Sequence, residues 1–346
     1  MKIVVLTGGD SPEREVALAS GECITKALRS RGHQVIEIDT ARGAKQLPQD
    51  VKLLPDGIRP QPPKLEELPA KHGELAVEAM RTSSMDGVDV VFVALHGGQG
   101  EDGTIQGLLD LVGVPYTGSG VLASALAMDK TVSKRIFEQV GVRTPPWMLV
   151  HWDKNPSIDE VAERIEKSFG FPVAVKPSNQ GSTVGFSAVQ YPDQLEVALR
   201  TAAVYGNEIL IEKFIEGREL TVAILEDRAL PVVEIHPEHG VYDYECKYTK
   251  GKSRYSVPAE IPAEVTAEIQ AQALKAYHAL KCEGYARIDF RLGTDNFTYC
   301  LEVNTLPGMT ETSLVPKAAR AVGIEFPELC ERIARLALQK KSKKKK

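Results

Sequence analysis

Two neighbouring strand-like runs near the C-terminus carry oxygen-bearing side chains at alternate positions. Asp289 lies on the first run, and Glu302 and Asn304 lie on the second. Side chains two residues apart share one face of a strand, so three oxygen ligands meet if the two faces coincide. Such donors suit Mg²⁺, which typically binds one or two carboxylates together with substrate phosphates. Arg287 shares the face of Asp289, and an ion-pair network is therefore the alternative interpretation.

A second candidate site is the loop that follows Lys176, the last residue of an apolar run. Residues 177–185 contain glycines and hydroxyl-bearing residues, which make a flexible loop with many backbone N–H donors. Such a loop suits phosphate. It is not the common phosphate-binding motif, because its lysine precedes the glycines. A plain hairpin turn is the alternative interpretation.

Other polar residues follow predicted strands or open predicted helices. Residues 209–219 pass from an apolar strand into a charged loop, where backbone groups could select adenine and Glu219 could accept from ribose hydroxyls. His96 follows a strand of an open α/β sheet, which is where ligands bind in such sheets. A solvated strand end and a structural histidine are the respective alternatives. Glu13 could be only a favourable charge at a helix N-terminus, and Lys130 could face solvent.

The first part of the chain reads as an open α/β domain over residues 1–128. Apolar runs at 2–6, 35–39 and 88–95 predict buried parallel strands, and Ser11-Pro12-Glu13 predicts a helix start. Strands that alternate with helices favour this fold class. Residues 43–85 interrupt the alternation with prolines and charges, and we interpret them as a surface insertion.

The rest of the chain predicts a mixed α/β and α+β organisation. A helix over 129–140 ends at Gly141, before Pro145-Pro146. The remaining predicted elements are strands at 173–176, 209–213, 220–225 and 231–235, a β-hairpin over 287–304, and helices at 316–321 and 326–338.

The composition limits the class of protein. The chain has 346 residues, of which 43% are hydrophobic, and this is enough for two or three domains. Its formal charge is −5 even though residues 340–346 hold six lysines, so the body is acidic and does not suggest a nucleic-acid binder. We expect that lysine-rich end to be a disordered, solvated tail, with weak attraction to anions or a membrane surface as the alternative. The five scattered cysteines and the lack of a long apolar run favour a cytoplasmic protein with no membrane partner.

Several of these segments occur together in one known family. In the order found here, they resemble the D-alanine–D-alanine ligases of the ATP-grasp superfamily over about residues 3–335. The matching stretches are Gly8-Gly9 with Ser11–Val16, Ala94–Gly97 with Gly100–Gly103, Pro115–Ser119, Met128–Lys130, Val175–Ser178, Tyr242–Glu245, Lys247-Tyr248, Glu302–Thr305 and Pro307–Thr310.

The resemblance implies a fold with an open α/β N-terminal domain followed by a two-lobed ATP-grasp fold. Its boundaries would be residues 1–128, 129–214 and 215–339, with ATP held between the second and third units. The family also implies a homodimer.

The resemblance implies roles for individual residues. Two Mg²⁺ ions, replaceable by Mn²⁺, would bind Asp289, Glu302 and Asn304. The residues implied to contact ATP are Lys130 and Lys176 at the phosphates, Glu212, Lys213 and Ile215 at adenine, and Glu219 at the ribose.

The implied reaction joins two D-alanines through an acyl phosphate and releases ADP and phosphate, for peptidoglycan precursor synthesis. Arg287 and the backbone N–H of Gly308 would stabilise the oxyanion. Glu13 would bind the first substrate's ammonium and join Ser182 and Tyr248 in a triad that links two lids, the loop 181–185 and the stretch 243–256. Further substrate contacts implied are His96 for the first D-alanine and Lys247, Ser313 and Leu314 for the carboxylate of the second.

Three alternatives remain open from the sequence. Ligases that form a D-lactate-terminated product resemble this pattern, although Tyr248 within the full run 242–248 favours the dipeptide. Another ATP-grasp carboxylate–amine ligase would use different acids. A nucleotide-binding protein without turnover would carry the same loop and pocket.

Overall fold

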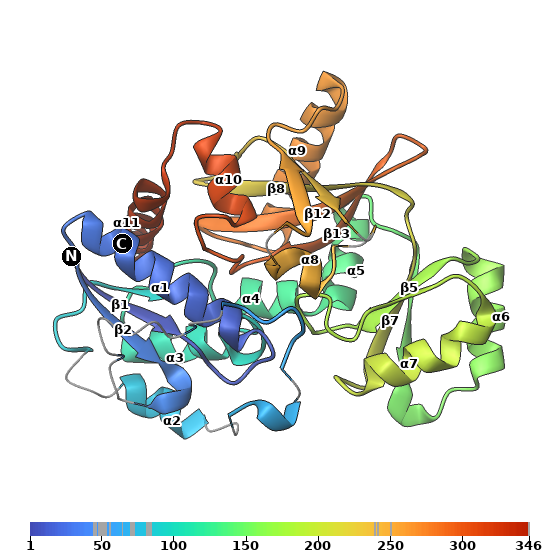
Figure 1. Cartoon of the computed structure of the whole chain (residues 1–346), viewed down its shortest axis with the longest axis horizontal. Coiled ribbons are helices and arrows are strands. Elements are labelled where there is room, and N and C mark those ends of the chain that lie inside the picture. The colour runs from blue at the N-terminus through green and yellow to red at the C-terminus, as the bar shows by residue number, and fades with distance from the viewer. Residues whose placement is uncertain are drawn as a thin grey trace.

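A computed structural model describes residues 1–43, 47, 54, 57–63, 65–69, 73–80, 85–238, 240, 242–249 and 251–344. The chain forms three sheets, each with its own helices, and the predicted α/β and α+β fold class is confirmed. Figure 1 shows the sheets as three adjoining bodies, with the one that contains β5 and β7 projecting to one side. In the described part of the chain, no helix is both long and apolar enough to cross a membrane.

The N-terminal unit is built on a parallel sheet of three strands in the order β2-β1-β3. Its apolar runs are buried on both faces, as parallel sheets require. The strands are β1 (Lys2–Thr7), β2 (Gln34–Asp39) and β3 (Val90–Val93). The helices are α1 (Arg14–Ser30), α2 (Gly73–Met80), α3 (Thr104–Val112) and α4 (Val121–Met128).

Residues 43–85 are more than the surface insertion that the sequence analysis expected. The described part includes α2, whose Ala76, Ala79 and Met80 are buried in the core of the N-terminal unit. The sequence analysis did not predict this helix, because prolines and charged residues are concentrated just before it, at residues 57–69. Residues 44–46, 48–53, 55–56, 64, 70–72 and 81–84 of this predicted insertion lie outside the described residues.

The second unit is an antiparallel sheet in the order β4-β7-β5-β6, with α6 and α7 packed on it. Its strands are β4 (Trp147–His151), β5 (Val173–Pro177), β6 (Ser187–Val189) and β7 (Glu208–Lys213). Its helices are α5 (Lys130–Val140), α6 (Ile158–Ser168) and α7 (Leu195–Ala203). Although α5 precedes this sheet in the chain, its Phe137 is buried against α9 in the core of the third unit.

The third unit is an antiparallel sheet in the order β11-β10-β8-β12-β13, with β9 paired to β8. Its strands are β8 (Gly217–Leu225), β9 (Arg228–Ala229), β10 (Val233–Pro237), β11 (Ser253–Ser256), β12 (Tyr285–Gly293) and β13 (Thr298–Asn304). Its helices are α8 (Tyr244–Tyr248), α9 (Ala263–Ala279) and α10 (Leu314–Arg320). The predicted hairpin is confirmed as β12 and β13.

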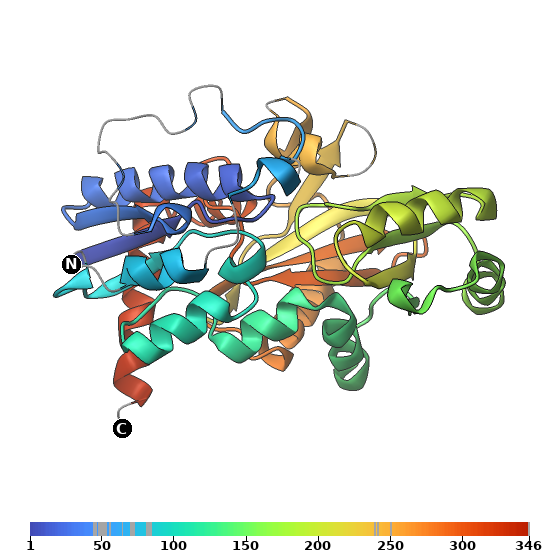
Figure 2. The same cartoon turned by 90° about the horizontal axis from the view of Figure 1, so that it is seen from below.

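The last helix, α11 (Phe326–Lys344), returns to the N-terminal unit and packs against α1 and β3. Figures 1 and 2 both show it beside that unit and away from the second sheet. The helix also corrects the expectation of a disordered end for residues 340–344, while residues 345–346 of that predicted tail lie outside the described residues. The helix continues through Lys344, and the Lys340 ammonium pairs with Glu283 and lies 5.5 Å from the Tyr116 ring centroid.

Candidate active site

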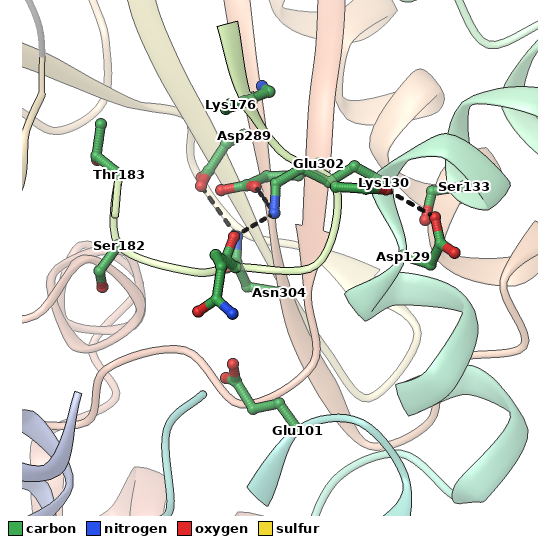
Figure 3. Close-up of polar contacts among 12 residues, drawn as sticks. Glu101, Asp129, Lys130, Ser133, Lys176, Ser182, Thr183, Asp289, Glu302 and Asn304 are labelled. Carbon is green, nitrogen blue, oxygen red and sulfur yellow. Dashed lines mark hydrogen bonds and ion pairs between the residues drawn. The ribbon is translucent and has the colours of Figure 1, made fainter. Parts of the chain in front are cut away.

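The register of β12 and β13 brings the predicted oxygen ligands together. Asp289 lies opposite Glu302, and Arg287 lies opposite Asn304, so all four side chains share one face of the hairpin. Figure 3 shows Asp289, Glu302 and Asn304 turned toward one another beside Lys130 from α5. The geometric expectation drawn from the alternation is confirmed.

Asp289 already has several partners in this arrangement. Arg287 donates to its two oxygens through Nε at 2.9 Å and Nη2 at 2.8 Å. Thr221 Oγ1 donates at 2.7 Å and Asn304 Nδ2 at 3.0 Å. The ion-pair network with Arg287, which the sequence left as an alternative, is therefore present.

Glu302 lies among cations. Its carboxylate is 3.1 Å from Lys130 Nζ, and Lys176 and Lys247 also face it. Burial alone would raise the pKa of Glu302, but these cations together with Arg287 hold it well below its usual range. Glu302 is therefore an anion that neighbouring positive charges stabilise strongly.

The side chains of Asp289, Glu302 and Asn304 supply only part of the ligands that a divalent cation needs. Among the described residues, no group of three or more histidine, cysteine, aspartate or glutamate side chains could hold a metal ion by itself. With one oxygen each, two carboxylates and one amide leave about half of the six positions of an octahedral ion to other ligands. Mg²⁺ usually fills such positions with substrate phosphates and water, so the residues suit an ion that arrives with a nucleotide.

A cavity between the second and third sheets has about 870 Å³ of empty space, part of it open to solvent. All six residues predicted to contact ATP line it, namely Lys130, Lys176, Glu212, Lys213, Ile215 and Glu219. Apolar walls come from Val184, Phe186, Phe214 and Leu301. An apolar slot that ends at lysines and carboxylates is suited to a planar base with a phosphate chain.

Lys130 reaches this cavity because the local sequence fixes the start of α5. The Asp129 side chain caps the helix by accepting from the backbone N–H of Thr131 and Val132, each at 3.0 Å. The same carboxylate accepts from Ser178 Oγ at 3.0 Å. Burial opposes ionisation of Asp129, but these hydrogen bonds lower its pKa. The cap thus joins α5 to the loop after Lys176.

Some of the six residues predicted to contact ATP have side-chain partners that the sequence did not predict. The Glu212 carboxylate lies 2.5 Å from Lys176 Nζ and 2.8 Å from Lys134 Nζ. Lys213 Nζ donates to the backbone oxygen of Phe171 at 2.9 Å. The side chains of Glu212 and Lys213 are therefore occupied, and contact with a base would fall to the backbone at this strand end.

Arg291 was missed by the sequence analysis. Its Nη1 lies 3.1 Å from Glu219 Oε2, and its guanidinium lies 5.6 Å from the Phe214 ring centroid. Burial raises the pKa of Glu219, and Arg291 opposes that shift. Arg291 follows Asp289 by two residues on β12, so the same alternation could have identified it.

A second cavity of about 1030 Å³, also partly open, adjoins the first. Gly181, Ser182, Tyr242, Lys247 and Glu302 line both. All the residues predicted for catalysis and substrate binding line this second cavity: Glu13, His96, Ser182, Lys247, Tyr248, Arg287, Gly308, Ser313 and Leu314.

The predicted triad forms a hydrogen-bonded chain across the second cavity. Ser182 Oγ donates to Glu13 and lies 2.9 Å from the Tyr248 hydroxyl. Burial, followed by the neighbouring Glu101, raises the pKa of Glu13, and His96 opposes the rise. A Cβ at Gly181 would lie 2.4 Å from Glu13 Oε2, so a larger residue there would push the Glu13 carboxylate from its present position. The chain joins the N-terminal unit to the loop 181–185 and to α8.

His96 is held on both sides of its ring. Nδ1 lies 2.9 Å from the backbone oxygen of Leu306, and Nε2 lies 3.0 Å from Ser20 Oγ. Ser20 Oγ in turn accepts from the Met309 backbone N–H at 3.2 Å. The structural role that the sequence left open is present, because the histidine holds the loop around Gly308 under the cavity.

Ile58 is a further lining residue that the sequence analysis missed. It lies within the segment that we interpreted as an insertion. The backbone N–H of Arg59 donates to Glu15 at 2.8 Å, and its guanidinium bonds Glu15 and Glu67. No local pattern predicts that this segment reaches the cavity.

Two family models match most of the chain. The model described as "D-ala D-ala ligase N-terminus" matches residues 2–119, and the one described as "D-ala D-ala ligase C-terminus" matches residues 136–335. A D-alanine–D-alanine ligase of Geobacter sulfurreducens is 45% identical over 96% of this chain and 92% of the relative. One from an Anaeromyxobacter species is 43% identical over 96% and 95%.

The fold has a close counterpart among solved structures. The D-alanine–D-alanine ligase of Bacillus anthracis, complexed with ATP, superposes with a TM-score of 0.78 at 30% identity. The match covers 99% of both chains. Sequence and fold therefore agree over nearly the full length.

Proposed function

Because the chain belongs to the D-alanine–D-alanine ligase family, we propose that its two adjoining cavities hold ATP and two D-alanines. The protein is an ATP-dependent ligase that forms D-alanyl-D-alanine through an acyl phosphate, for peptidoglycan precursor synthesis. The observation that carries the assignment of the site is the continuity of the two cavities at Lys247 and Glu302. A phosphoryl group at this junction would meet nucleotide on one side and substrate on the other.

The first cavity binds ATP. Lys130 and Lys176 contact the phosphates, the backbone around Glu212, Lys213 and Ile215 holds the adenine, and Glu219 accepts from the ribose. The density of cations around Glu302 supports the phosphate end of this assignment, since a polyphosphate needs neutralising charge when it is buried.

Asp289, Glu302 and Asn304 hold two Mg²⁺ ions, for which Mn²⁺ can substitute. When bound, the ions neutralise charge on the transferring phosphoryl group. Lys130 and Arg287, which pair with these carboxylates here, are then free to turn toward phosphate and substrate oxygens.

The first step joins the carboxylate of one D-alanine to the γ-phosphoryl group, and the bond to ADP breaks. Glu13 holds that substrate's ammonium, and His96 orients it. The chain from Glu13 through Ser182 to Tyr248 keeps the loop 181–185 closed and excludes water that would hydrolyse the acyl phosphate.

In the second step the amine of another D-alanine, after losing a proton, attacks the acyl carbon, and phosphate leaves. Lys247, Ser313 and the backbone of Leu314 hold its carboxylate. Arg287 and the Gly308 backbone N–H stabilise the oxyanion, and loss of one such donor typically costs about 10²–10³ in rate.

Phosphate release measured with D-alanine, L-alanine and D-alanine plus D-lactate tests this function. We expect release with D-alanine and ligation to the dipeptide, and at least a 100-fold loss in Glu302→Gln, which removes a charged metal ligand. Phosphate release with L-alanine alone would reject D-alanine as the substrate. No phosphate release under any of these conditions would favour a nucleotide-binding protein without turnover.

We assign the protein to the cytoplasm, as a homodimer, with domains at 1–128, 129–214 and 215–339.

The surface of the N-terminal unit supports the dimer. Leu111 at the end of α3 is 88% exposed, and Leu122 on α4 is 53% exposed. Val112 and Val121 beside them in the sequence are also exposed. Exposed apolar side chains on two consecutive helices are candidates for an interface.

A further inference from the structure

Lys134 is a buried cation for which the reaction described above has no use. It lies on α5 one turn after Lys130, and its side chain is fully buried. Its Nζ lies 2.8 Å from Glu212 Oε2 and donates to Thr144 Oγ1 at 2.5 Å. The Thr144 hydroxyl must therefore donate elsewhere, and it does so to the Cys300 backbone oxygen at 2.8 Å.

The neighbours of Lys134 form a charged layer under the nucleotide cavity. Glu212 lies between two ammonium groups, with Oε1 2.5 Å from Lys176 and Oε2 2.8 Å from Lys134. Within this group of three, two cations and one anion leave an excess of one positive charge, which faces Glu302 and Glu219 through Lys176. Burial lowers the pKa of Lys134, and Glu212 opposes that shift. Removing Lys134 would leave Glu212 and Lys176 as a neutral pair.

We propose that Lys134 is a positioning residue for nucleotide binding, which acts through Glu212 to leave Lys176 available to the phosphates of ATP. By sharing the carboxylate, Lys134 weakens the hold of Glu212 on Lys176 and supplies the excess positive charge. Lys176 lines the cavity, whereas Lys134 does not, so Lys134 acts without touching the nucleotide. The inference rests on the proposed phosphate role of Lys176.

A purely structural role for Lys134 makes a different prediction. If the lysine only anchors α5 to β7 and, through Thr144, to β13 at Cys300, its loss would deform the whole cavity. Binding of adenosine and of phosphorylated nucleotides would then weaken together. If Lys134 acts through Lys176, only ligands that carry phosphates lose affinity.

The test compares binding of ADP with Mg²⁺ and of adenosine by calorimetry in the full-length protein. Lys134→Met keeps a similar chain length and removes the charge. We expect ADP affinity to fall about tenfold, equivalent to roughly 1.4 kcal/mol, while adenosine affinity changes less than twofold. Lys275→Met, an exposed lysine on α9 that contacts the end of α5, is the charge-matched control and should bind both ligands as the parent does.

The double variant Lys134→Met/Glu212→Gln provides a rescue. It restores the excess of one positive charge and releases Lys176, so ADP affinity should recover at least partly from that of Lys134→Met. Additive losses would overturn the inference, as would parallel losses of ADP and adenosine or unchanged ADP binding in Lys134→Met. Melting temperatures of all variants identify any that fail to fold, and Lys134→Gln then replaces Lys134→Met.

Lys176→Met separates this inference from the proposed function. If the phosphate role of Lys176 is correct, this variant loses ADP affinity by at least as much as Lys134→Met. Unchanged ADP binding in Lys176→Met would refute the proposed phosphate contact itself. A loss in Lys176→Met with none in Lys134→Met would refute only the role of Lys134.

Discussion

At the scale of single residues, most buried charges of this molecule have opposite charges beside them, and Glu37 is an exception. It lies on β2 with 9% of its surface exposed. Burial raises its pKa to about 7 and the charge of Glu22 adds to the shift, while Thr25, Arg29 and Lys26 oppose it. A carboxylate that folding makes harder to ionise costs stability at neutral pH.

The substitution Glu37→Gln should therefore raise the free energy of unfolding, by an amount that depends on pH. The folded-state pKa is above the unfolded value, so the native state binds more protons between pH 4.5 and about 7, and parent stability falls as pH rises through that window. At pH 8 the variant should gain up to about 3 kcal/mol, since each pKa unit is worth about 1.4 kcal/mol, and near pH 4 it should gain little. Urea unfolding at both pH values measures this.

Glu331→Gln is a control for which the expected change in stability has the opposite sign. Hydrogen bonds from Arg335 and Arg31, against some burial, lower the pKa of Glu331 to about 2. The stability it contributes is present above its unfolded pKa and is lost as pH falls toward 2. This variant should be less stable than the parent at pH 8, with the difference shrinking in acid. An equal gain for Glu37→Gln at pH 4 and pH 8 would contradict the argument.

Without the family resemblance, the sequence could predict only residues that a short-range pattern brings together, whereas the triad of Glu13, Ser182 and Tyr248 was predicted from the resemblance alone. Alternation along β12 and β13 is sufficient to bring Asp289, Glu302 and Asn304 to one face, and the same face contains Arg287. Lys134 has no such signal. In the sequence it is an ordinary helical lysine, and only the packing of α5 beneath Glu212 makes it a buried cation.

At the scale of elements, three segments from different parts of the chain close over the second cavity. The loop 181–185 carries Ser182 and Thr183 with φ of 47° and 63°, an uncommon backbone region for such residues. Lys247 of α8 donates to Thr183 Oγ1 at 2.9 Å and holds that loop. The third segment, residues 57–63, is tied to the start of α1 through Arg59 and Glu15.

Arg59→Ala should loosen that third segment without affecting the nucleotide cavity. The Arg59 side chain is half exposed, and ion pairs at such positions, here with Glu15 and Glu67, typically contribute up to about 1 kcal/mol each. Because Ile58 lines the second cavity, we expect KM for D-alanine to rise about two- to fivefold, while KM for ATP stays constant.

The matched control for this variant is Arg200→Ala, which removes an exposed ion pair with Glu196 on α7. Initial rates with each substrate varied in turn separate the two KM values. Equal changes in both, or a change in ATP alone, would show that residues 57–63 do not form a wall of the D-alanine site. The sequence could not predict this wall, because a segment rich in proline and charge carries no signal of where it docks.

At the scale of the whole molecule, the C-terminal helix packs against the N-terminal unit. The helix α11 packs on α1 and β3, and its Glu331 carboxylate accepts a hydrogen bond from Arg31, which directly follows α1. The sequence predicted a helix over residues 326–338. It could not predict the partner of this helix, because periodicity reports which side of a helix is buried and not what buries it.

The whole-molecule surface leads to a prediction about assembly. Leu111 and Leu122 stand exposed at the ends of α3 and α4, in a unit whose own core is complete without them. Exposure of two leucines is costly unless a partner covers them, and burial of each is worth roughly 1.5–3 kcal/mol. Leu111→Glu with Leu122→Glu should therefore convert the proposed dimer into monomers, by burying unpaired charges on both sides of a two-fold interface.

Sedimentation velocity of the Leu111→Glu/Leu122→Glu variant over a range of protein concentrations measures this change. The control is Val197→Glu with Val204→Glu, because these valines on and just after α7 are also well exposed, at 69% and 62%, but lie on the second unit. The control should sediment as the parent does. A parent that is monomeric at every concentration, or a leucine variant that remains dimeric, would show that the surface formed by α3 and α4 is not the interface. Since the two cavities lie outside these helices, monomers should keep their affinity for ADP, and a loss of that affinity would instead indicate that assembly supports the site.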